Sequence, residues 1–333
     1  MQGLSGSAVA HMAQALEEES RGRHELARGW LARAFRAGEP AALRLLAESL
    51  MLRDPIRPRE GSEMMREAAL QGDARAAFIC ATIAGQGSDD PARWEQAMEF
   101  LDIAARLGSV EARHAGALLG DAASIRAGEA RASTVSHALH QSPRIGVCEG
   151  FATPAECDWL IARATPRLQA ARLYDPASGK GLRETGVRNN RDAAFDICQS
   201  DLVLVSLRAR MAAMLAINVQ QMEPAMVLHY TPGQYFAPHF DGLDPTQAPL
   251  AREIAAKGQR IATVLAYLND EYGEGHTNFP ALDWRFKGRK GDALWFWNVG
   301  PDGVLDPKTL HAGLAPLGGE KWLLSQWIRA PRW

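Results

Sequence analysis

The stretch QYFAPHFDGLD, residues 234–244, places a histidine two residues before an aspartate, with aromatic side chains on both sides. Side chains alternate between the two faces of a β-strand, so His239 and Asp241 would point the same way from a strand. An imidazole and a carboxylate that face the same way are suitable metal ligands. Because one such pair can arise by chance, the hypothesis requires further residues that fit the same site.

A third ligand is available in TLHAG, where His311 follows His239 by 72 residues. That distance allows several strands to form and return to the same place. Two imidazoles and one carboxylate on one face of an iron(II) ion leave its other positions open for a chelating co-substrate and oxygen. We therefore predict a catalytic metal site made of His239, Asp241 and His311.

The co-substrate 2-oxoglutarate provides a second criterion, because its distal carboxylate needs a cation or strong donors once it is buried. Of the 37 basic residues, 31 are arginine and only six are lysine. One of these lysines, Lys321, stands ten residues after His311 at the start of the apolar run KWLLSQW. An unpaired charge is expensive there, so we predict that Lys321 anchors the distal carboxylate.

The second half of the chain has the pattern of a β-protein with two helices. Short apolar runs separated by glycine and proline predict strands in RIGVCEGF, AMVLHYT, QRIATVLAYLND, DALWFWNV and KWLLSQWIRA. Helices are predicted in TPAECDWLIARATPRL, with Thr153 as its cap, and in DLVLVSLRARMAAMLAI. Many short strands favour a sandwich or a barrel-like double sheet.

The first 125 residues are rich in alanine, leucine, glutamate and arginine, which is typical of helices. Three similar segments carry turn glycines at Gly38, Gly72 and Gly108, spaced by 34 and 36 residues. Helix pairs with such a period indicate an α-solenoid, and the pattern resembles Sel1-like and tetratricopeptide repeats. An ordinary helical bundle is the alternative. We place a helical domain at 1–125, a polar linker at 126–142 and the β-domain at 143–333.

Composition excludes several classes of protein. The formal net charge is −2, which offers no electrostatic basis for binding nucleic acid or an acidic membrane. No apolar run is long enough to span a bilayer, and the first 20 residues do not have the pattern of a secretory signal. Four scattered cysteines without a CxxC pair favour a reduced, cytoplasmic setting. A soluble protein without membrane or nucleic-acid partners is expected.

Residues 143–333 resemble the prolyl 4-hydroxylase type of iron(II)/2-oxoglutarate dioxygenase, a family with a double-stranded β-helix, or jelly-roll, fold. The resemblance runs through EGFATPAECDWLI, LHYTPGQYFAPHFD, GHTNFP, KGDALWFWN and LHAGLAPLGGEKWLLSQWIR. It implies hydroxylation of an unactivated C–H bond, with release of succinate and carbon dioxide. The implied cofactors are iron(II), 2-oxoglutarate and oxygen, with ascorbate as a further candidate.

Matching positions imply roles for individual residues. The metal ligands would be the three residues named above, and the co-substrate would contact Lys321, Tyr230 and Thr263. The substrate-side positions are Arg260, Glu223, Trp327 and Arg188, the last of which follows a glycine-rich loop at 174–186 that is suited to closing over a substrate.

Three departures from the family pattern concern the substrate side. Phe236 stands where a tyrosine is common, Glu274 replaces a glycine, and Asn189 and Asn190 replace the usual Thr-Ser. The substrate is therefore open between a prolyl or other residue in a peptide or protein, which the repeats could recruit, and a free amino acid or peptide natural product. The alternative from another class is a helical-repeat scaffold with an inactive β-domain.

Overall fold

The computed structural model describes residues 6–86, 91–120, 136–175, 180–182 and 186–331. It divides into two compact units, the first formed by Met1–Ala127 with Ile197–Ser206 and the second by Gly128–Asp196 with Leu207–Trp333. None of the helices in the described ranges combines the length and apolar character that crossing a membrane requires.

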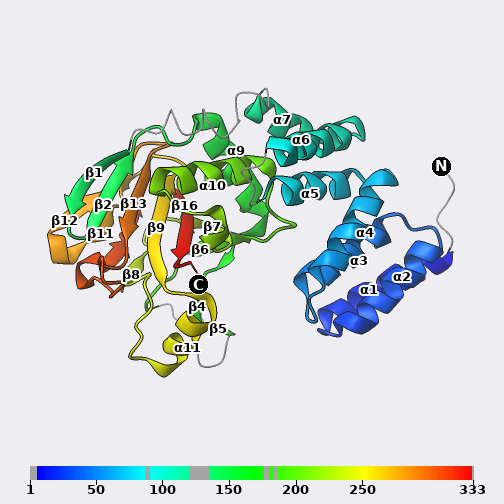
Figure 1. Cartoon of the computed structure of the whole chain (residues 1–333), viewed down its shortest axis with the longest axis horizontal. Helices are drawn as coiled ribbons and strands as arrows, with labels where there is room; N and C mark the ends of the chain where they lie inside the picture. The colour runs from blue at the N-terminus through cyan, green and yellow to red at the C-terminus, as the bar shows by residue number, and fades with distance from the viewer. Residues whose placement is uncertain (1–5, 87–90, 121–135, 176–179, 183–185, 332–333) are drawn as a thin grey trace. The chain divides into compact units, whose positions relative to one another are not determined.

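The first unit consists of consecutive α-helices, coloured blue to cyan in Figure 1, each packed against the next along the chain. In chain order they are α1 (Gly6–Ser20), α2 (His24–Arg36), α3 (Ala41–Leu52), α4 (Pro58–Leu70), α5 (Ala74–Gly85), α6 (Pro91–Arg106) and α7 (Val110–Leu119).

The three turn glycines share one geometry. Gly38, Gly72 and Gly108 have φ values of 94°, 96° and 99°, a region that favours glycine because it has no Cβ. At each turn the glycine N–H and the next N–H bond to carbonyls of the preceding helix, as Gly38 does to Phe35 O (2.9 Å) and Glu39 to Ala34 O (3.0 Å). This is the Schellman pattern of helix ends, and its repetition is consistent with the predicted helix pairs.

The predicted domain boundaries are wrong for the segment Ile197–Ser206, which they assign to the β-domain. It belongs to the helical unit, where Arg75 donates to the carbonyl of Cys198 (2.7 Å). Leu202, at the start of α10 (Leu202–Leu215), lies where a side chain on Gly85 would be. The apolar start of α10 therefore completes the packing around α5.

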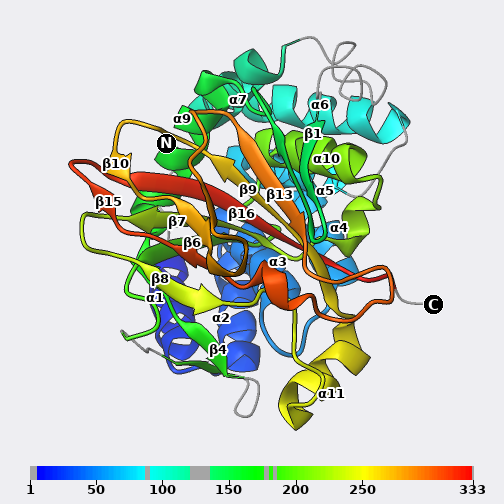
Figure 2. The ribbon, with the colours of Figure 1, turned by 90° about the vertical axis from the view of Figure 1, so that its left-hand side faces the viewer.

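The second unit contains an eight-stranded and a four-stranded antiparallel sheet, several of whose strands are labelled in Figure 2. The larger sheet has the order β1-β2-β13-β9-β16-β7-β6-β3, and the smaller has the order β12-β11-β14-β8. The strands of the larger sheet are β1 (Ser136–Gln141), β2 (Arg144–Cys148), β3 (Gln169–Ala170), β6 (Arg191–Phe195), β7 (Ala225–Tyr230), β9 (Arg260–Tyr267), β13 (Ala293–Trp297) and β16 (Lys321–Arg329). Those of the smaller are β8 (Phe236–His239), β11 (Thr277–Phe279), β12 (Trp284–Phe286) and β14 (His311–Gly313).

Shorter elements complete this unit. The helix predicted after Thr153 is α9 (Pro154–Ala164), and Thr153 caps it together with Glu156. The remaining elements are the hairpin β4 (Leu173–Asp175) and β5 (Lys180–Leu182), the pair β10 (Gly273–Glu274) and β15 (Pro316–Leu317), the helix α11 (Ala248–Lys257), and the 3₁₀ turns η1 (Thr165–Arg167), η2 (Val219–Gln221), η3 (Pro280–Leu282) and η4 (Pro307–Thr309).

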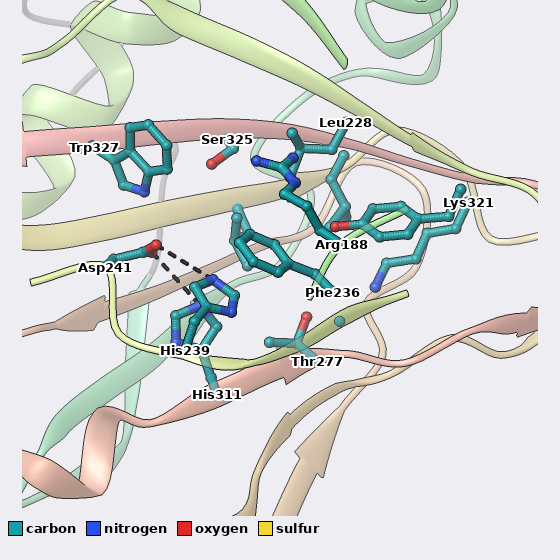
Figure 3. Close-up of a pocket in the computed structure, with 14 residues that line it drawn as sticks. Arg188, Leu228, Phe236, His239, Asp241, Thr277, His311, Lys321, Ser325 and Trp327 are labelled. Carbon is teal, nitrogen blue, oxygen red and sulfur yellow. Dashed lines mark ion pairs between the residues drawn. The ribbon is translucent and has the colours of Figure 1, made fainter. Parts of the chain in front are cut away.

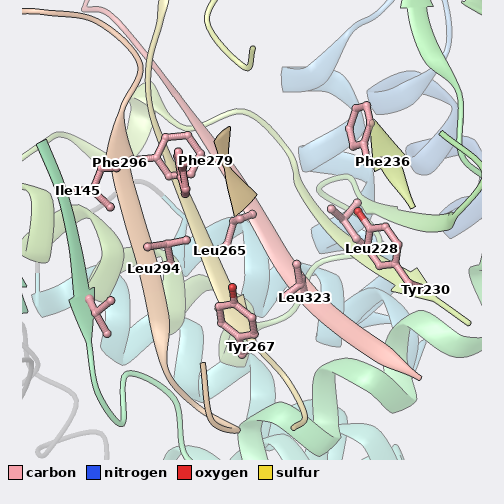
Figure 4. Packing of buried hydrophobic residues seen from close by; sticks show 11 residues of the cluster. Ile145, Leu228, Tyr230, Phe236, Leu265, Tyr267, Phe279, Leu294, Phe296 and Leu323 are labelled. Carbon is pink, nitrogen blue, oxygen red and sulfur yellow. The ribbon is translucent and has the colours of Figure 1, made fainter. Parts of the chain in front are cut away.

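The core lies between the inner faces of the two sheets (Figure 4). Phe236 and Phe279 from the smaller sheet and residues such as Leu265, Phe296 and Leu323 from the larger sheet form one buried cluster. Alternation along each strand sends these side chains inward. The two facing sheets confirm the predicted architecture of a helical region followed by a jelly-roll domain.

The predicted linker and the predicted loop both contain strand residues. The linker predicted at 126–142 is wrong in part, because residues 136–141 form β1, which pairs with β2 to make a hairpin at the edge of the larger sheet. Residues 126–135 lie outside the described residues. The loop predicted at 174–186 lies partly outside them too, and its described portions include strand residues of the hairpin β4–β5.

Candidate active site

The three predicted metal ligands lie together at one end of the smaller sheet. His239 ends β8, His311 begins the neighbouring strand β14, and the two residues are direct partners across the strands. Asp241 lies just beyond β8, and its carboxylate oxygens are 3.6 Å from Nε2 of His239 and 3.6 Å from Nε2 of His311. One ligand atom from each residue lies within 4.8 Å of the others, as Figure 3 illustrates.

The donor atoms fit an iron(II) ion. Nδ1 of His239 donates to the carbonyl of Ala237 (2.8 Å), and Nδ1 of His311 donates to the carbonyl of Thr309 (3.0 Å). With its proton on Nδ1, each ring presents an unprotonated Nε2 toward Asp241, which is how second-shell partners orient histidine ligands. Two imidazole nitrogens and one carboxylate are the donor set of non-haem iron(II) centres.

Electrostatics favour the ligating forms of two of these residues. Burial lowers the pKa of His311 to about 4, and the nearby His239 acts in the same direction. Burial alone would raise the pKa of Asp241, but His311, His239 and a hydrogen bond from Thr263 outweigh it and hold that pKa well below its usual range. Near neutral pH the site therefore presents a neutral His311 and an ionised Asp241.

Lys321 lies in the same pocket, which its side chain lines together with Tyr230, Thr277 and Gly313. It begins β16 opposite Tyr230, the last residue of β7, and is 0% exposed. Among the residues that the structure describes, nothing accepts a hydrogen bond from its Nζ, and the ring of Tyr230 is centred 5.2 Å from that nitrogen. Burial lowers the pKa of Lys321 to about 7 and raises that of Tyr230 to about 12.

The predicted co-substrate contact Thr263 is placed elsewhere. It does not line this pocket, and its hydroxyl donates to Oδ2 of Asp241 at 2.7 Å. The threonine that lines the pocket is Thr277 in β11, which was not among the predicted site residues. Strand alternation in HTNFP could have indicated it, because Thr277 points the same way as the buried Phe279.

Trp327, Ser325 and Arg188 also line the pocket (Figure 3). Trp327 and Ser325 stand on the same face of β16 as Lys321, and strand alternation from Lys321 could have identified Ser325. Nε1 of Trp327 is buried and has no hydrogen-bond partner in the described part of the chain. Nη2 of Arg188 lies 3.5 Å from Asp192 and likewise lacks a hydrogen-bond partner there.

Arg188 is brought to the pocket by the edge of the smaller sheet. Its segment pairs with β8 through a bridge to Phe236 and a hydrogen bond from Ala237 N to Val187 O (2.7 Å). The guanidinium lies 4.4 Å from the centre of the Phe236 ring. The Phe236 ring in turn stacks on His239 with centroids 3.5 Å apart. Phe236 is therefore a packing partner of a predicted metal ligand.

Two predicted substrate contacts, Arg260 and Glu223, are not among the residues that line the pocket. They form a bidentate ion pair, in which Nε and Nη2 of Arg260 donate to the two carboxylate oxygens of Glu223 at 2.6 Å and 3.0 Å. Glu223 also accepts a hydrogen bond from Nε of Arg329 (2.6 Å). The Arg260 guanidinium lies 3.8 Å from the centre of the Trp327 ring. Glu223 therefore fixes the Arg260 guanidinium, which in turn packs on the ring of Trp327.

Residues 225–329, which include the triad and Lys321, match the 2OG-Fe(II) oxygenase superfamily. Prolyl 4-hydroxylase 1 of Arabidopsis thaliana is 33% identical over 222 residues, a match that covers 63% of this chain and 75% of the plant protein. The chain belongs to the prolyl 4-hydroxylase family of 2OG-Fe(II) oxygenases. It is thus a 2-oxoglutarate-dependent dioxygenase, as predicted.

Two further relatives of the family have a viral origin. A putative prolyl 4-hydroxylase of Acanthamoeba polyphaga mimivirus is 41% identical over 184 residues, covering 55% of this chain and 73% of the viral protein. The crystal structure of a viral collagen prolyl hydroxylase from Paramecium Bursaria Chlorella virus-1, in complex with 2OG, is 30% identical. It aligns with 56% of this chain and 96% of its own, with a TM-score of 0.43.

Proposed function

We propose that this chain hydroxylates a prolyl residue in a peptide or protein, using iron(II), 2-oxoglutarate and oxygen and releasing succinate and carbon dioxide. The observation that carries the proposal is the pocket that joins the His239–Asp241–His311 cluster to a buried lysine for which the described residues provide no hydrogen-bond partner. The metal ion would bind on the triad and supply the oxygen chemistry.

The residues around Lys321 suit the distal carboxylate of 2-oxoglutarate. Its ammonium would donate to that carboxylate, and the hydroxyls of Tyr230 and Thr277 line the same part of the pocket. A buried ammonium paired with a carboxylate recovers the interaction that burial took from both groups. Leu228, Leu265 and Leu323 line the pocket as well and would exclude water around the co-substrate.

The donors on the substrate side support a prolyl substrate. Trp327 Nε1, Arg188 Nη2 and the Ser325 hydroxyl can each donate a hydrogen bond. A prolyl residue in a peptide has no N–H and presents carbonyl acceptors on both sides of its ring. A free amino acid would add an ammonium that needs an acceptor, and the acidic residue lining this pocket is the metal ligand Asp241. The donors therefore favour a peptide.

We further propose that the helical unit recruits the polypeptide substrate and that ascorbate sustains turnover. The recruiting role follows from the extended surfaces that stacked helix pairs offer to other proteins. Succinate formation with and without ascorbate tests the cofactor. Comparing a long proline-containing polypeptide with a short peptide from it tests recruitment, which predicts a lower KM for the longer substrate at similar kcat.

The main test is incubation of the full chain with iron(II), 2-oxoglutarate and paired peptides that carry proline or alanine at one position. We expect a gain of one oxygen atom in the proline peptide alone, with matching succinate. His239→Ala and Asp241→Ala should abolish both products, whereas His229→Ala, which changes a histidine outside the pocket, should retain them. Succinate formation by either triad variant at the wild-type rate would refute the metal site. Hydroxylation of free proline but not of the peptide would refute the substrate class.

A further inference from the structure

Behind the predicted metal ligand Asp241, two buried polar side chains form a chain of hydrogen bonds. The hydroxyl of Thr263 in β9 donates to Asp241 Oδ2 at 2.7 Å. Nδ2 of Asn298, which follows β13, donates to the Thr263 oxygen at 3.2 Å. Both side chains are 0% exposed, so neither can exchange these bonds for water.

The direction of each bond follows from the chemistry of the groups. An ionised carboxylate can only accept, so the single hydroxyl proton of Thr263 must point at Asp241. The Thr263 oxygen is then an acceptor, and of the two ends of the Asn298 amide only Nδ2 can donate to it. This orientation leaves Asn298 Oδ1 buried with no hydrogen-bond partner in the described residues. Leaving Oδ1 buried and unpaired costs free energy, which indicates that the hydrogen bond from Nδ2 to Thr263 serves a purpose.

The surroundings of the chain hold it in place. Thr263 lies in the middle of the larger sheet, opposite Phe296 of β13 on one side and Trp327 of β16 on the other. The backbone N–H of Asn298 donates to Ile261 O (2.8 Å), and its carbonyl accepts from Asp306 N (3.0 Å). Thr263 and Asn298 are therefore fixed on rigid backbone.

Gly242, the residue after Asp241, packs closely against Asn298 and Leu305. A Cβ on Gly242 would lie 2.5 Å from Leu305 Cδ1 and 3.2 Å from Asn298 Cβ. Glycine at this position allows the loop that carries Asp241 to lie directly against Asn298. Three features, the two donors and the missing side chain, thus converge on the position of one carboxylate.

We propose that Thr263 and Asn298 are positioning residues that hold the Asp241 carboxylate in its metal-binding orientation. The inference rests on the proposed function, in which Asp241 is a metal ligand. Removing the Thr263 hydroxyl would leave the carboxylate free to rotate and would bury one of its oxygens without a donor. Loss of an outer-shell partner commonly weakens metal binding about 10- to 100-fold.

The test measures binding of Mn²⁺, as a stable substitute for iron(II), to the full chain without co-substrate, by electron paramagnetic resonance of the free ion. We expect Thr263→Val, which keeps the size of the side chain, to raise the Kd for Mn²⁺ about 10- to 100-fold. Thr263→Ser, which keeps the hydroxyl, should stay near the wild-type value. Asn298→Asp should also weaken binding, because an acceptor there would draw the Thr263 proton away from Asp241.

Thr82→Val is the matched control. Thr82 is also 0% exposed and its hydroxyl contacts the carbonyls of Phe78 and Ser200, in the helical unit. Thermal unfolding of the metal-free proteins will compare the stability cost of the two valine variants. A structural role alone would lower both melting temperatures and leave the Kd for Mn²⁺ unchanged.

The outcomes separate this inference from the proposed function. If Asp241→Ala binds Mn²⁺ as tightly as the wild type, the metal site itself is refuted. If Asp241→Ala loses binding while Thr263→Val stays within about twofold of the wild type, the positioning role is refuted and the metal site stands. Weak binding by Thr263→Val that Thr263→Ser restores supports the inference.

Discussion

Two buried cations, Arg28 in the helical unit and Lys321 in the β unit, have opposite surroundings. Arg28 in the helical unit is 4% exposed and donates to Ser49 Oγ (3.1 Å), Ser49 O (2.7 Å), Arg53 O (2.7 Å) and Glu25 (2.7 Å). Lys321 in the β unit is 0% exposed and has no hydrogen-bond partner in the described part of the chain. Burying a charge is costly unless it is paired.

This difference indicates a structural role for Arg28 and agrees with the proposed co-substrate role of Lys321. The bonds of Arg28 connect α2 to the end of α3, so its charge contributes to the fold. The fold gains nothing comparable from Lys321, and the missing partner is one that a bound carboxylate can supply. The comparison therefore predicts effects of opposite sign on stability when each cation is replaced by an apolar side chain.

The largest effect is expected from Lys321→Met on co-substrate binding. Without the ammonium, the distal carboxylate would be buried unpaired, which commonly costs about 2–5 kcal/mol, or about 30- to 5,000-fold in Kd. Calorimetry with 2-oxoglutarate on the Mn²⁺-loaded chain measures it. The same substitution should raise the free energy of unfolding, measured with urea, by about 1–2 kcal/mol, because it removes a buried donor that has no acceptor. Lys308→Met, at an exposed lysine, should change neither quantity. Lower stability with unchanged affinity would reverse our assignment.

The next effect is expected from Arg28→Met, which should destabilise the helical unit by about 2–3 kcal/mol, since the buried carbonyl of Ser49 loses a charged donor. Urea unfolding followed by far-ultraviolet circular dichroism measures the change. Arg36→Met provides a control on the same helix α2, because Arg36 is exposed and should change stability by less than about 0.5 kcal/mol. Equal effects of the two substitutions would contradict the structural role of Arg28.

Several of these features could be predicted from local patterns in the sequence. The shared location of Lys321 and the triad could be predicted, because a rare lysine opens an apolar strand and because spacing and strand alternation bring His239, Asp241 and His311 together. The two facing sheets followed from short apolar runs whose periodicity survives in the structure, as in β9 and β16.

Other features depend on contacts that local patterns do not encode. Strand alternation turns both Thr263 and Thr277 toward the inner faces of the sheets, but it cannot show that the Thr263 hydroxyl bonds to Asp241 and does not line the pocket. The ion pairs of Glu223 with Arg260 and Arg329 span 37 and 106 residues, so local patterns could not distinguish Glu223 and Arg260 from substrate contacts. The inclusion of Ile197–Ser206 in the helical unit likewise depends on tertiary packing.

A third prediction concerns proton uptake when 2-oxoglutarate binds. Burial lowers the pKa of Lys321 to about 7, so at pH 8 the free side chain is mostly neutral, and pairing with a carboxylate restores its charge. Binding at pH 8 should therefore take up close to one proton, and affinity should fall by up to about tenfold per pH unit above pH 7. Calorimetry in buffers of different ionisation enthalpy measures this. A keto acid without a distal carboxylate, 2-oxobutyrate, should take up none, and equal uptake by both ligands would exclude Lys321 as the source.

The same pKa has a consequence for stability, with a defined sign. The folded-state pKa of Lys321 lies below its ordinary value of 10.5, so between about pH 7 and 10.5 the unfolded chain binds more protons than the folded chain. Stability contributed through this group therefore rises with pH across that window. Lys321→Met should remove this part of the slope, whereas Arg28→Met should not.

The smallest effects are expected at glycines of the helical unit, where local backbone geometry decides the sign. Gly38→Ala should destabilise by about 1 kcal/mol, because φ is 94° and an added Cβ meets nothing within 4 Å, so strain alone acts. Gly29→Ala in the exposed middle of α2 also meets nothing, and should stabilise by about 1 kcal/mol through helix propensity. Urea unfolding measures both. Equivalent turns would give Gly72→Ala and Gly108→Ala the same cost as Gly38→Ala, whereas unequal costs would show that the three turns are not energetic repeats. Since none of these changes touches a buried charge, co-substrate affinity should remain unchanged in all four variants.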